Sequence, residues 1–441
     1  MTYPLIRKAT PHDYEAIWSI WMQDHVIQWM SFTKQGKEEF KAHYERMSQA
    51  SDIYVLVDTV EGKEKVMAVR RIKFGQGPHR HTAEYCSMGV DKDSQGKGYA
   101  KLFYAEFLNI VKEKGCIKRI QLTQSGGNFN AFHLADKTFS QEAIFPDWLA
   151  RKTNGGHFYL IERYVYQLID ENLAKQAPGI PSLQFDEQPP LLQGKDLYPV
   201  SIQRNQNQFT ACVDNAPVLT VDFDPDDSVI RHIGFLSIQL PTSNDEAAAA
   251  AALRSILAAL LQEGRVKKLE LFTESPAIAK LCQAAGFYVR GEKIASYFDE
   301  QSQTYKNELG LEYSFMRIDD ARDLIVARIA DPVKRNDIDK MLLGCQSLIQ
   351  ELAKKEGYDA LGVCYLENMV YQAVRDGLEA QKLISLTDRR WLPLVSKMPV
   401  AFKEELFALV KAMQPSSLTF FQPAPVISTT VTATAPINSM E

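Results

Sequence analysis

Gln95-Gly96-Lys97-Gly98-Tyr99-Ala100 is the stretch of sequence that decides the fold. It lies between a predicted strand, Thr82–Val90, and a segment, Tyr99–Lys114, whose apolar residues recur at helical spacing. Glycines let a backbone come close to an anion, and the first turn of a helix presents free N–H groups and a partial positive charge. The loop therefore predicts a site for phosphate groups, with a plain structural turn as the alternative.

Strands and helices are predicted on both sides of this loop from the period of the apolar residues. A strand over Leu5–Ala9 leads into a helix that begins at Thr10-Pro11, because threonine caps helices and proline suits the first helical position. Gly115 is expected to end the helix after the loop. The other predicted elements are a hairpin of Ile53–Asp58 and Val66–Phe74, strands Ile117–Thr123, Ala143–Trp148 and His157–Leu168, and a helix over 130–137.

This order of elements, with the pattern Q-x-x-G-x-A at residues 95–100, resembles the GNAT superfamily of N-acetyltransferases. The resemblance covers residues 1–170 and implies an α/β (α+β) fold, a GNAT-like mixed sheet flanked by helices. It implies acetyl-CoA as co-substrate, bound through its pyrophosphate, and no metal. Rossmann and P-loop sites are disfavoured because G-x-G-x-x-G and G-K-[ST] are missing. The cofactor-binding residues that the resemblance implies are Met88, Val90, Gln95, Gly96, Lys97, Gly98, Tyr99 and Ala100.

The resemblance also implies catalytic groups on the strand before the loop. Acetyl transfer to an amine needs a base for the ammonium proton and donors for the oxyanion. Glu84 is the expected general base, because carboxylate bases occur at this strand position in the family; a surface or salt-bridged glutamate is the alternative. A backbone N–H near Met88 is the expected oxyanion donor, with Gly89 easing a distortion of the strand; an ordinary paired strand residue is the alternative.

One catalytic group of the family is missing. A tyrosine is common in a segment like N-x-x-A-x-x-L-Y, and residues 128–135 place Ala135 in its position. Tyr85, Tyr104 and His133 are the candidates to replace this acid; a thiolate can also leave unassisted, since a thiol has a pKa of about 8–9. Helical spacing alone would place the aromatic residues of the first helix in the core. The residues expected on the acceptor side are Trp18, Trp21, Asp24, His25, Trp29 and Phe32, with Arg70 or Arg71 from the hairpin.

A second copy of the same order of elements is predicted over residues 200–320, so two tandem GNAT-like copies are expected. Gly115 and Gly264, each expected to end a long helix, lie 149 residues apart. The second copy has Asp245 and Glu246 where the first has its glycine loop, and carboxylates there would repel a pyrophosphate. We expect a degenerate domain without cofactor binding; packing, dimerisation and substrate enclosure are the roles left open.

The whole chain is expected to contain about three domains, because 441 residues are about three times the usual domain length. A partial third repeat is predicted near the end, because a helix, a glycine, a strand at Ala360–Tyr365 and another helix follow one another there. The expected divisions are an acetyltransferase domain over 1–170, a proline-rich linker over 171–199, the degenerate domain over 200–320, a mainly helical region over 321–414 and a disordered tail over 415–441.

Charge and cysteine content restrict the expected partners and location. The net charge of −5 argues against binding to nucleic acid or to anionic membranes. Residues 171–320 hold 13 basic and 21 acidic residues, a balance that would attract a cationic amine or a basic protein surface. The six cysteines form no C-x-x-C pair, and the first 25 residues contain acids and no long apolar stretch. Reduced thiols and a cytoplasmic location are therefore expected.

Three hypotheses about function follow. The first is an acetyl-CoA-dependent N-acetyltransferase that acts on a primary amine of a small molecule or protein by direct attack, with a carboxylate base. The second is a binding or regulatory protein built on degenerate acetyltransferase folds, which the missing tyrosine and the second copy favour. The third is a secreted bacterial effector, exported by a non-classical route, which rests on the tandem architecture and the flexible tail. A homodimer is a further expectation.

Overall fold

The computed structural model describes residues 4–30, 32–125, 138–153, 156–177, 199–225, 233–240, 245–329 and 331–380. Its strands are β1 (Leu5–Lys8), β2 (Asp52–Val60), β3 (Lys63–Phe74), β4 (Thr82–Val90), β5 (Arg119–Ser125), β6 (Ser140–Thr153), β7 (Gly156–Leu168), β8 (Val200–Asn205), β9 (Gln208–Val213), β10 (Ala216–Pro225), β11 (Ile233–Gln239), β12 (Lys268–Thr273), β13 (Tyr288–Asp299) and β14 (Thr304–Ser314). Its α-helices are α1 (Tyr14–Trp21), α2 (Asp24–Ile27), α3 (Lys37–Ala50), α4 (Tyr99–Lys114), α6 (Leu173–Gln176), α7 (Glu246–Glu263), α8 (Pro276–Ala284), α9 (Ile318–Leu324), α10 (Pro332–Glu356) and α11 (Ala360–Ala380).

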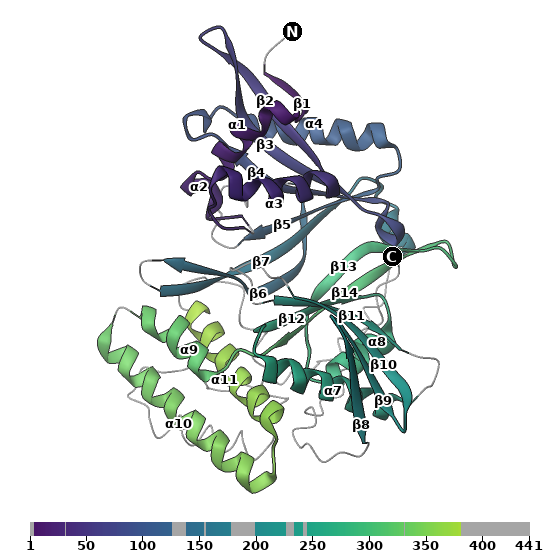
Figure 1. The fold of residues 1–441 in the computed structure, drawn as a ribbon, viewed down its shortest axis with the longest axis vertical. Helices are drawn as coiled ribbons and strands as arrows, with labels where there is room; N and C mark the ends of the chain where they lie inside the picture. Colours follow the sequence, from purple (N-terminus) through teal and green to yellow (C-terminus); the bar gives the residue numbers. More distant parts are fainter. Residues whose placement is uncertain are drawn as a thin grey trace, which may run out of the picture.

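The described strands form one 14-stranded sheet (Figure 1). Its order is β1-β2-β3-β4-β5-β7-β6-β13-β14-β12-β11-β10-β9-β8. The first seven strands and the last seven therefore follow the same order outward from the junction of β6 with β13. In each half one adjacent pair is parallel, β4 with β5 and β11 with β12. We call the half with β1–β7 the first unit and the half with β8–β14 the second unit.

Helices cover both faces of the first unit because its strands alternate apolar side chains between the two faces. Along β2, Leu56 packs in one buried cluster with Phe103 of α4. The next residue, Val57, packs in another cluster with Trp21 of α1 and Phe40 of α3. The face that carries α1–α3 is therefore opposite the face that carries α4.

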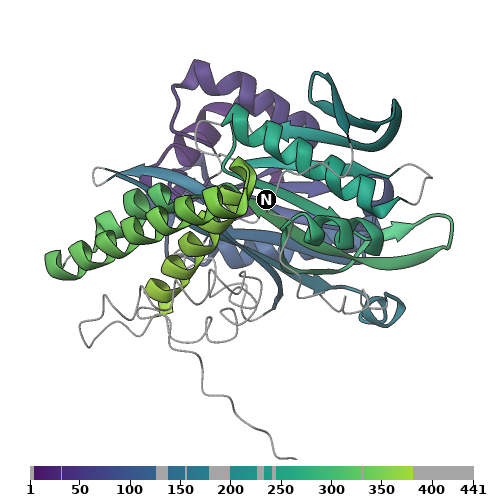
Figure 2. The same ribbon diagram turned by 90° about the horizontal axis from the view of Figure 1, so that it is seen from below.

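The second unit has its own long helix and is covered further by the C-terminal helices. Leu253 of α7 packs in one buried cluster with Leu269 of β12, as α4 packs on the first unit. A turn joins β8 directly to β9, so this unit has no counterpart of α1–α3 at that point. Helices α10, in green, and α11, in yellow-green, pack against each other (Figures 1 and 2). Asn368 Nδ2 of α11 donates hydrogen bonds of 2.8 Å to Ser314 Oγ and to the carbonyl of Met316.

Several predicted elements agree with the structure, and one is wrong. Strand β4 and helix α4 have the predicted bounds, and Gly115 ends α4 with a φ of 66°. The predicted strand Ala360–Tyr365 is wrong, since these residues begin α11. Asp359 Oδ1 accepts a hydrogen bond of 2.8 Å from the N–H of Gly362 and so caps a helix there. The sequence patterns do not predict α3, β13 or β14, and the predicted helix over 130–137 and the tail lie outside the described residues.

The two units are joined where β13 lies beside β6. Gly291 of β13 lies opposite Ala143 with a φ of 155°, and a Cβ on it would lie 2.1 Å from the carbonyl oxygen of Glu142, so only glycine allows this close approach. Three consecutive carbonyls of β13, which we call the junction segment, then accept hydrogen bonds from the first unit. These bonds run from Arg119 Nε to Ile294 (2.8 Å), from His81 Nε2 to Ala295 (2.8 Å) and from His79 Nδ1 to Ser296 (2.9 Å).

Candidate active site

The glycine loop has a backbone conformation that glycine alone adopts without strain. Gly96 and Gly98 have φ angles of 78° and 79°, and a Cβ on either would meet nothing within 4 Å, so conformation and not packing requires glycine here. The N–H of Lys101 donates to the carbonyl of Gly98 at 2.9 Å. Over the described part of the chain, the backbone N–H groups of residues 96–100 have no such partner. These donors at the start of α4 are free to bind an anion.

The side chains of the loop divide between solvent and the protein interior. Gln95 and Lys97 are exposed, whereas Tyr99 is buried. The Tyr99 hydroxyl donates a hydrogen bond of 2.7 Å to Asp58 Oδ2 on β2, and this bond and burial raise the pKa of Tyr99 to about 12. Tyr99 is thus placed to offer its backbone N–H to a ligand while its side chain fixes the first turn of α4.

Strand β4 contains a β-bulge at the position where the resemblance implies an oxyanion donor. Ser87 and Met88 together lie opposite the single residue Arg70 on β3, and Ser87 has a φ of 50°. A bulge leaves a backbone group without a ladder partner. The distortion is at Ser87 and not at Gly89. A Cβ on Gly89 would lie 3.1 Å from Trp21 Cδ1, so this glycine serves the close packing of α1 on β4.

Glu84 lies where β4 and β5 stop pairing. The parallel register joins Thr82–Glu84 to Arg119–Gln121, and β4 then continues alone on that side to Val90. The Glu84 side chain is half-buried. Throughout the residues that the structure describes, nothing forms a hydrogen bond or an ion pair with its carboxylate. A partly shielded carboxylate without a fixed partner is suited to accept a proton from a ligand.

Of the two arginines considered for the acceptor side, Arg71 lies on the face of Glu84. Its Nε donates to Cys86 Sγ at 3.2 Å, and Cys86 shares a face with Glu84 because the two are separated by one strand residue. Arg70 points to the opposite face, where its guanidinium lies over the ring of Tyr85. Burial raises the pKa of the Cys86 thiol, which favours its neutral form beside Arg71.

The tyrosines considered as replacement acids belong to the core on the α4 side. Tyr85 stacks on Phe107 with ring centroids 4.6 Å apart, and burial raises its pKa to about 12. Tyr104 donates a hydrogen bond of 2.5 Å to Gln167 Oε1. Both lie opposite the face of Glu84, which does not favour either as the acid. His133 and Ala135 lie outside the described residues.

Helices α1 and α2 hold the end of β4 through side chains that were expected to line the acceptor side. Trp21 Nε1 donates to the carbonyl of Ser87 at 3.1 Å, and His25 Nε2 donates to the carbonyl of Val90 at 2.9 Å. Gln23, which no sequence pattern singles out, accepts from the N–H of Lys92 at 2.9 Å. Trp21 and Phe32 are core residues. Trp29 packs against a cluster that includes Phe145 and Ile233, and so reaches the second unit.

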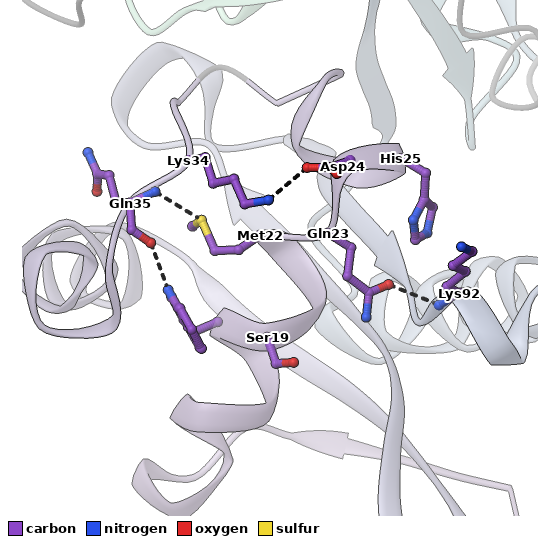
Figure 3. Close-up of a pocket in the computed structure, with 9 residues that line it drawn as sticks. Ser19, Met22, Gln23, Asp24, His25, Lys34, Gln35 and Lys92 are labelled. Atoms are coloured by element: carbon purple, nitrogen blue, oxygen red, sulfur yellow. Dashed lines mark hydrogen bonds and ion pairs between the residues drawn. The ribbon is translucent and has the colours of Figure 1, made fainter.

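A pocket of about 530 Å³ lies beside the end of β4, between α1, α2 and residues 34–35 (Figure 3). Three residues expected on the acceptor side line it: Trp18, Asp24 and His25. An ion pair of 2.7 Å joins Lys34 Nζ to Asp24 Oδ1 across the pocket, and Lys92 lines it from the start of the loop. The pocket therefore combines aromatic surface with charges of both signs.

Comparison with known proteins identifies the N-terminal region. Residues 14–139 match the family model described as the acetyltransferase (GNAT) family. The N-terminal region is a GNAT acetyltransferase domain. No curated protein matches the chain.

Solved structures of acetyltransferases also resemble the GNAT domain, with coverage of 90–100% of their own chains. They include an N-acetyltransferase from Staphylococcus aureus Mu50 (20% identity, 38% of this chain, 100% of that chain, TM-score 0.32), a ribosomal-protein-alanine N-acetyltransferase from Brucella melitensis (19%, 37%, 99%, 0.31) and a phosphinothricin acetyltransferase from Sinorhizobium meliloti in complex with acetyl-CoA (14%, 38%, 90%, 0.32).

The second unit differs from the GNAT domain at each candidate site position. The register of β11 with β12 begins at Ile233 and places Phe235 third, the place that Glu84 has in β4. The pairing of β11 with β10 shows no bulge. The helix α7 starts after Asp245, whose carboxylate accepts a hydrogen bond of 2.9 Å from the N–H of Ala248. The N–H of Ala248 is therefore already bonded to this carboxylate and is not free to bind a phosphate.

Two general properties complete the description. Within the described ranges, no group of three or more histidine, cysteine, aspartate or glutamate side chains is arranged to hold a metal ion. In the same residues, no helix combines the length and the apolar character that crossing a membrane requires.

Proposed function

We propose that the GNAT domain transfers the acetyl group of acetyl-CoA to a primary amine of a small molecule or a protein, with Glu84 as the general base. The observation that supports this proposal is the position of Glu84. Its carboxylate is half-buried and unpaired within the described part of the chain, at the point where β4 leaves β5. The same strand then carries the bulge and leads to the glycine loop, so base, bulge and loop lie in sequence along one strand.

The residues proposed to hold acetyl-CoA are Met88 and Val90 on β4 and Gln95–Ala100 in the loop. The free N–H groups of residues 96–100 fit a pyrophosphate, and the open space around Gly96 and Gly98 admits it. Lys97 adds an exposed ammonium group nearby. Acetyl-CoA supplies the activated acetyl thioester when it is bound.

The chain itself contributes proton transfer and orientation. Glu84 accepts the proton of the ammonium group of the acceptor, which leaves the nitrogen lone pair free for direct attack. The backbone N–H at the bulge of Ser87–Met88 donates to the oxygen on which negative charge develops.

The test is isothermal titration calorimetry of the full chain with acetyl-CoA, followed by a thiol-release assay with a panel of amines and peptides. We expect one molecule of acetyl-CoA per chain, because the second unit lacks the glycine loop, and release of CoA with at least one amine. Two binding sites per chain would contradict the degenerate role of the second unit. Failure to bind acetyl-CoA would overturn the proposal. Binding without thiol release would favour the regulatory alternative, which the alanine at position 135 motivates.

A further inference from the structure

We infer that Arg70 of β3 stabilises the negative charge on the sulfur of CoA as it leaves, and so compensates for the missing tyrosine acid. This inference rests on the proposed function, which includes the binding of acetyl-CoA along β4. It assigns a task to a buried charge that the proposed steps do not use. Arg70 acts by its charge and gives up no proton, because a guanidinium stays protonated in proteins.

Arg70 is a buried cation without an anionic partner. The residue is only 8% exposed. Over the residues that the structure describes, no carboxylate forms an ion pair with it. Its Nη2 donates a hydrogen bond to the carbonyl of Tyr85, whereas its Nε is buried and has no acceptor among the same residues. A buried charge without a counter-charge strongly destabilises a folded protein. A negative charge that arrives with a ligand would remove this cost.

The side chains packed around Arg70 stabilise its charge without neutralising it. The guanidinium carbon lies 3.0 Å from the ring centroid of Tyr85, and Tyr54 is its register partner on β2. Burial lowers the pKa of Arg70 from 12.5 to about 10, so the group is still cationic at neutral pH. The charged or titratable groups that act on it are Tyr85, Cys86, Glu84 and Arg71.

Arg70 lies at the bulge of β4. It is the single residue of β3 opposite Ser87 and Met88, and its hydrogen bond to the carbonyl of Tyr85 holds the guanidinium against the backbone of β4. Backbone N–H groups lie in the plane of a sheet, between its two faces. An atom bound by the N–H at the bulge therefore lies between the face of Arg70 and the face of Glu84. The proposed base and this cation flank the proposed site of reaction from opposite sides.

The leaving sulfur needs a stabilising group. In direct attack, the amine nitrogen forms a bond to the acetyl carbon, and Glu84 takes the amine proton. The C–S bond breaks, and its electron pair leaves with the sulfur as a thiolate. Position 135 is alanine, and burial raises the pKa of Tyr85 to about 12, which makes this phenol a weak acid. A fixed cation stabilises a thiolate without any proton transfer.

The experiment measures the titration of the thiol of CoA bound to the full chain. A thiolate absorbs in the ultraviolet, and the complex with desulfo-CoA, which has no thiol, supplies the baseline. We expect the pKa of the bound thiol to lie about one unit or more below that of free CoA in the same buffer. Arg70→Met should abolish this lowering, whereas Arg70→Lys should keep most of it because the charge remains. Arg46→Met, on the exposed surface of α3, is the matched control.

Steady-state kinetics give a second readout. Arg70→Met should lower kcat about 100-fold, because the charge on the sulfur develops only during the reaction. The KM for acetyl-CoA should change less than about twofold, because the thioester sulfur carries no charge before the reaction. Arg70→Lys should recover most of kcat. A purely structural role would lower the activity of Arg70→Met without moving the titration of the bound thiol.

The outcomes separate this inference from the proposed function. A thiol that titrates in the wild-type complex as it does in free CoA overturns the inference, and this measurement needs no variant to fold. An equally lowered pKa in Arg70→Met overturns it as well. If the lowering depends on Arg70 but no amine releases CoA, the action of Arg70 on the sulfur stands and the proposed function fails. Acetyl transfer with an unshifted thiol leaves only the proposed function standing, and absence of CoA binding overturns both.

Discussion

The third residue of the parallel pairing is Glu84 in β4 and Phe235 in β11. This position is one of those at which the two units differ chemically. Glu84 keeps a free carboxylate among the described residues, whereas Phe235 packs against a cluster that contains Phe145 and Ile233. Trp29, from the loop after α2, packs against the same cluster. Phe235 of the second unit and Trp29 of the first unit therefore pack against the same cluster, which contains residues of both units.

Replacement of Glu84 by glutamine tests its role as the base. Glutamine keeps the size of the side chain but cannot accept the proton, so we expect kcat to fall about 100-fold. The Kd for acetyl-CoA should change less than about twofold, because the loop is untouched. Steady-state thiol release and calorimetry measure the two effects. Glu113→Gln, on the exposed surface of α4, is the matched control. An unchanged kcat in Glu84→Gln would remove Glu84 from the mechanism.

Helix α4 and the loop before it are proposed to bind phosphate through backbone N–H groups. Both ends of α4 carry a glycine in the left-handed region: Gly98 at the start with a φ of 79° and Gly115 at the end with a φ of 66°. An alanine at either position meets the same unfavourable conformation. Only the first position lies among the N–H groups proposed to bind acetyl-CoA.

Gly98→Ala and Gly115→Ala therefore form a matched pair. Each should destabilise the protein by about 1–2 kcal/mol, because a residue with a Cβ is strained in the left-handed region. Only Gly98→Ala should also weaken the binding of acetyl-CoA, with a Kd about tenfold higher, since relief of the strain moves the N–H groups at the start of α4. Thermal unfolding and calorimetry give the two quantities. Equal affinity in both variants would argue against phosphate binding by this loop.

Elements with local signals could be predicted from the sequence, and elements without them could not. The glycines at positions 98 and 115 delimit α4. Short apolar runs are ambiguous, so the apolar run Ala360–Tyr365 predicts a strand, although Asp359 caps a helix there. Glu84 lies within a local pattern that the family resemblance interprets. The junction between the units has no such pattern, because it depends on pairing between β6 and β13, which are far apart in the sequence.

At the scale of the whole molecule, the junction between the units is expected to be sensitive to acid. Burial lowers the pKa of His81 from 6.5 to about 4, despite its hydrogen bond to the carbonyl of Ala295; Arg119, His79 and Lys118 lower it further. Between these two values the unfolded chain binds a proton that the folded protein excludes. The contribution of His81 to the free energy of unfolding is therefore fully present above pH 6.5. It falls as the pH is lowered towards 4, by at most about 1.4 kcal/mol per pH unit.

Urea unfolding at pH 7, 6 and 5 measures this dependence. His81→Gln should lower the stability at pH 7, because the junction loses a buried hydrogen bond, and should reduce the loss of stability between pH 7 and 5. His12→Gln is the control, since His12 is exposed. A pH dependence in His81→Gln equal to that of the wild type would show that other groups make the protein sensitive to acid.

The pairing of β6 with β13 also has a consequence for synthesis on the ribosome. Ala143 of β6 meets Gly291 of β13, so the two partners are 148 residues apart. At about 5–20 residues per second, the first unit waits roughly 7–30 s with the edge of β6 uncovered. Exposed strand edges invite pairing with other chains. The nascent protein is therefore most prone to aggregation in this interval, and a chaperone that covers a bare strand edge would improve its yield.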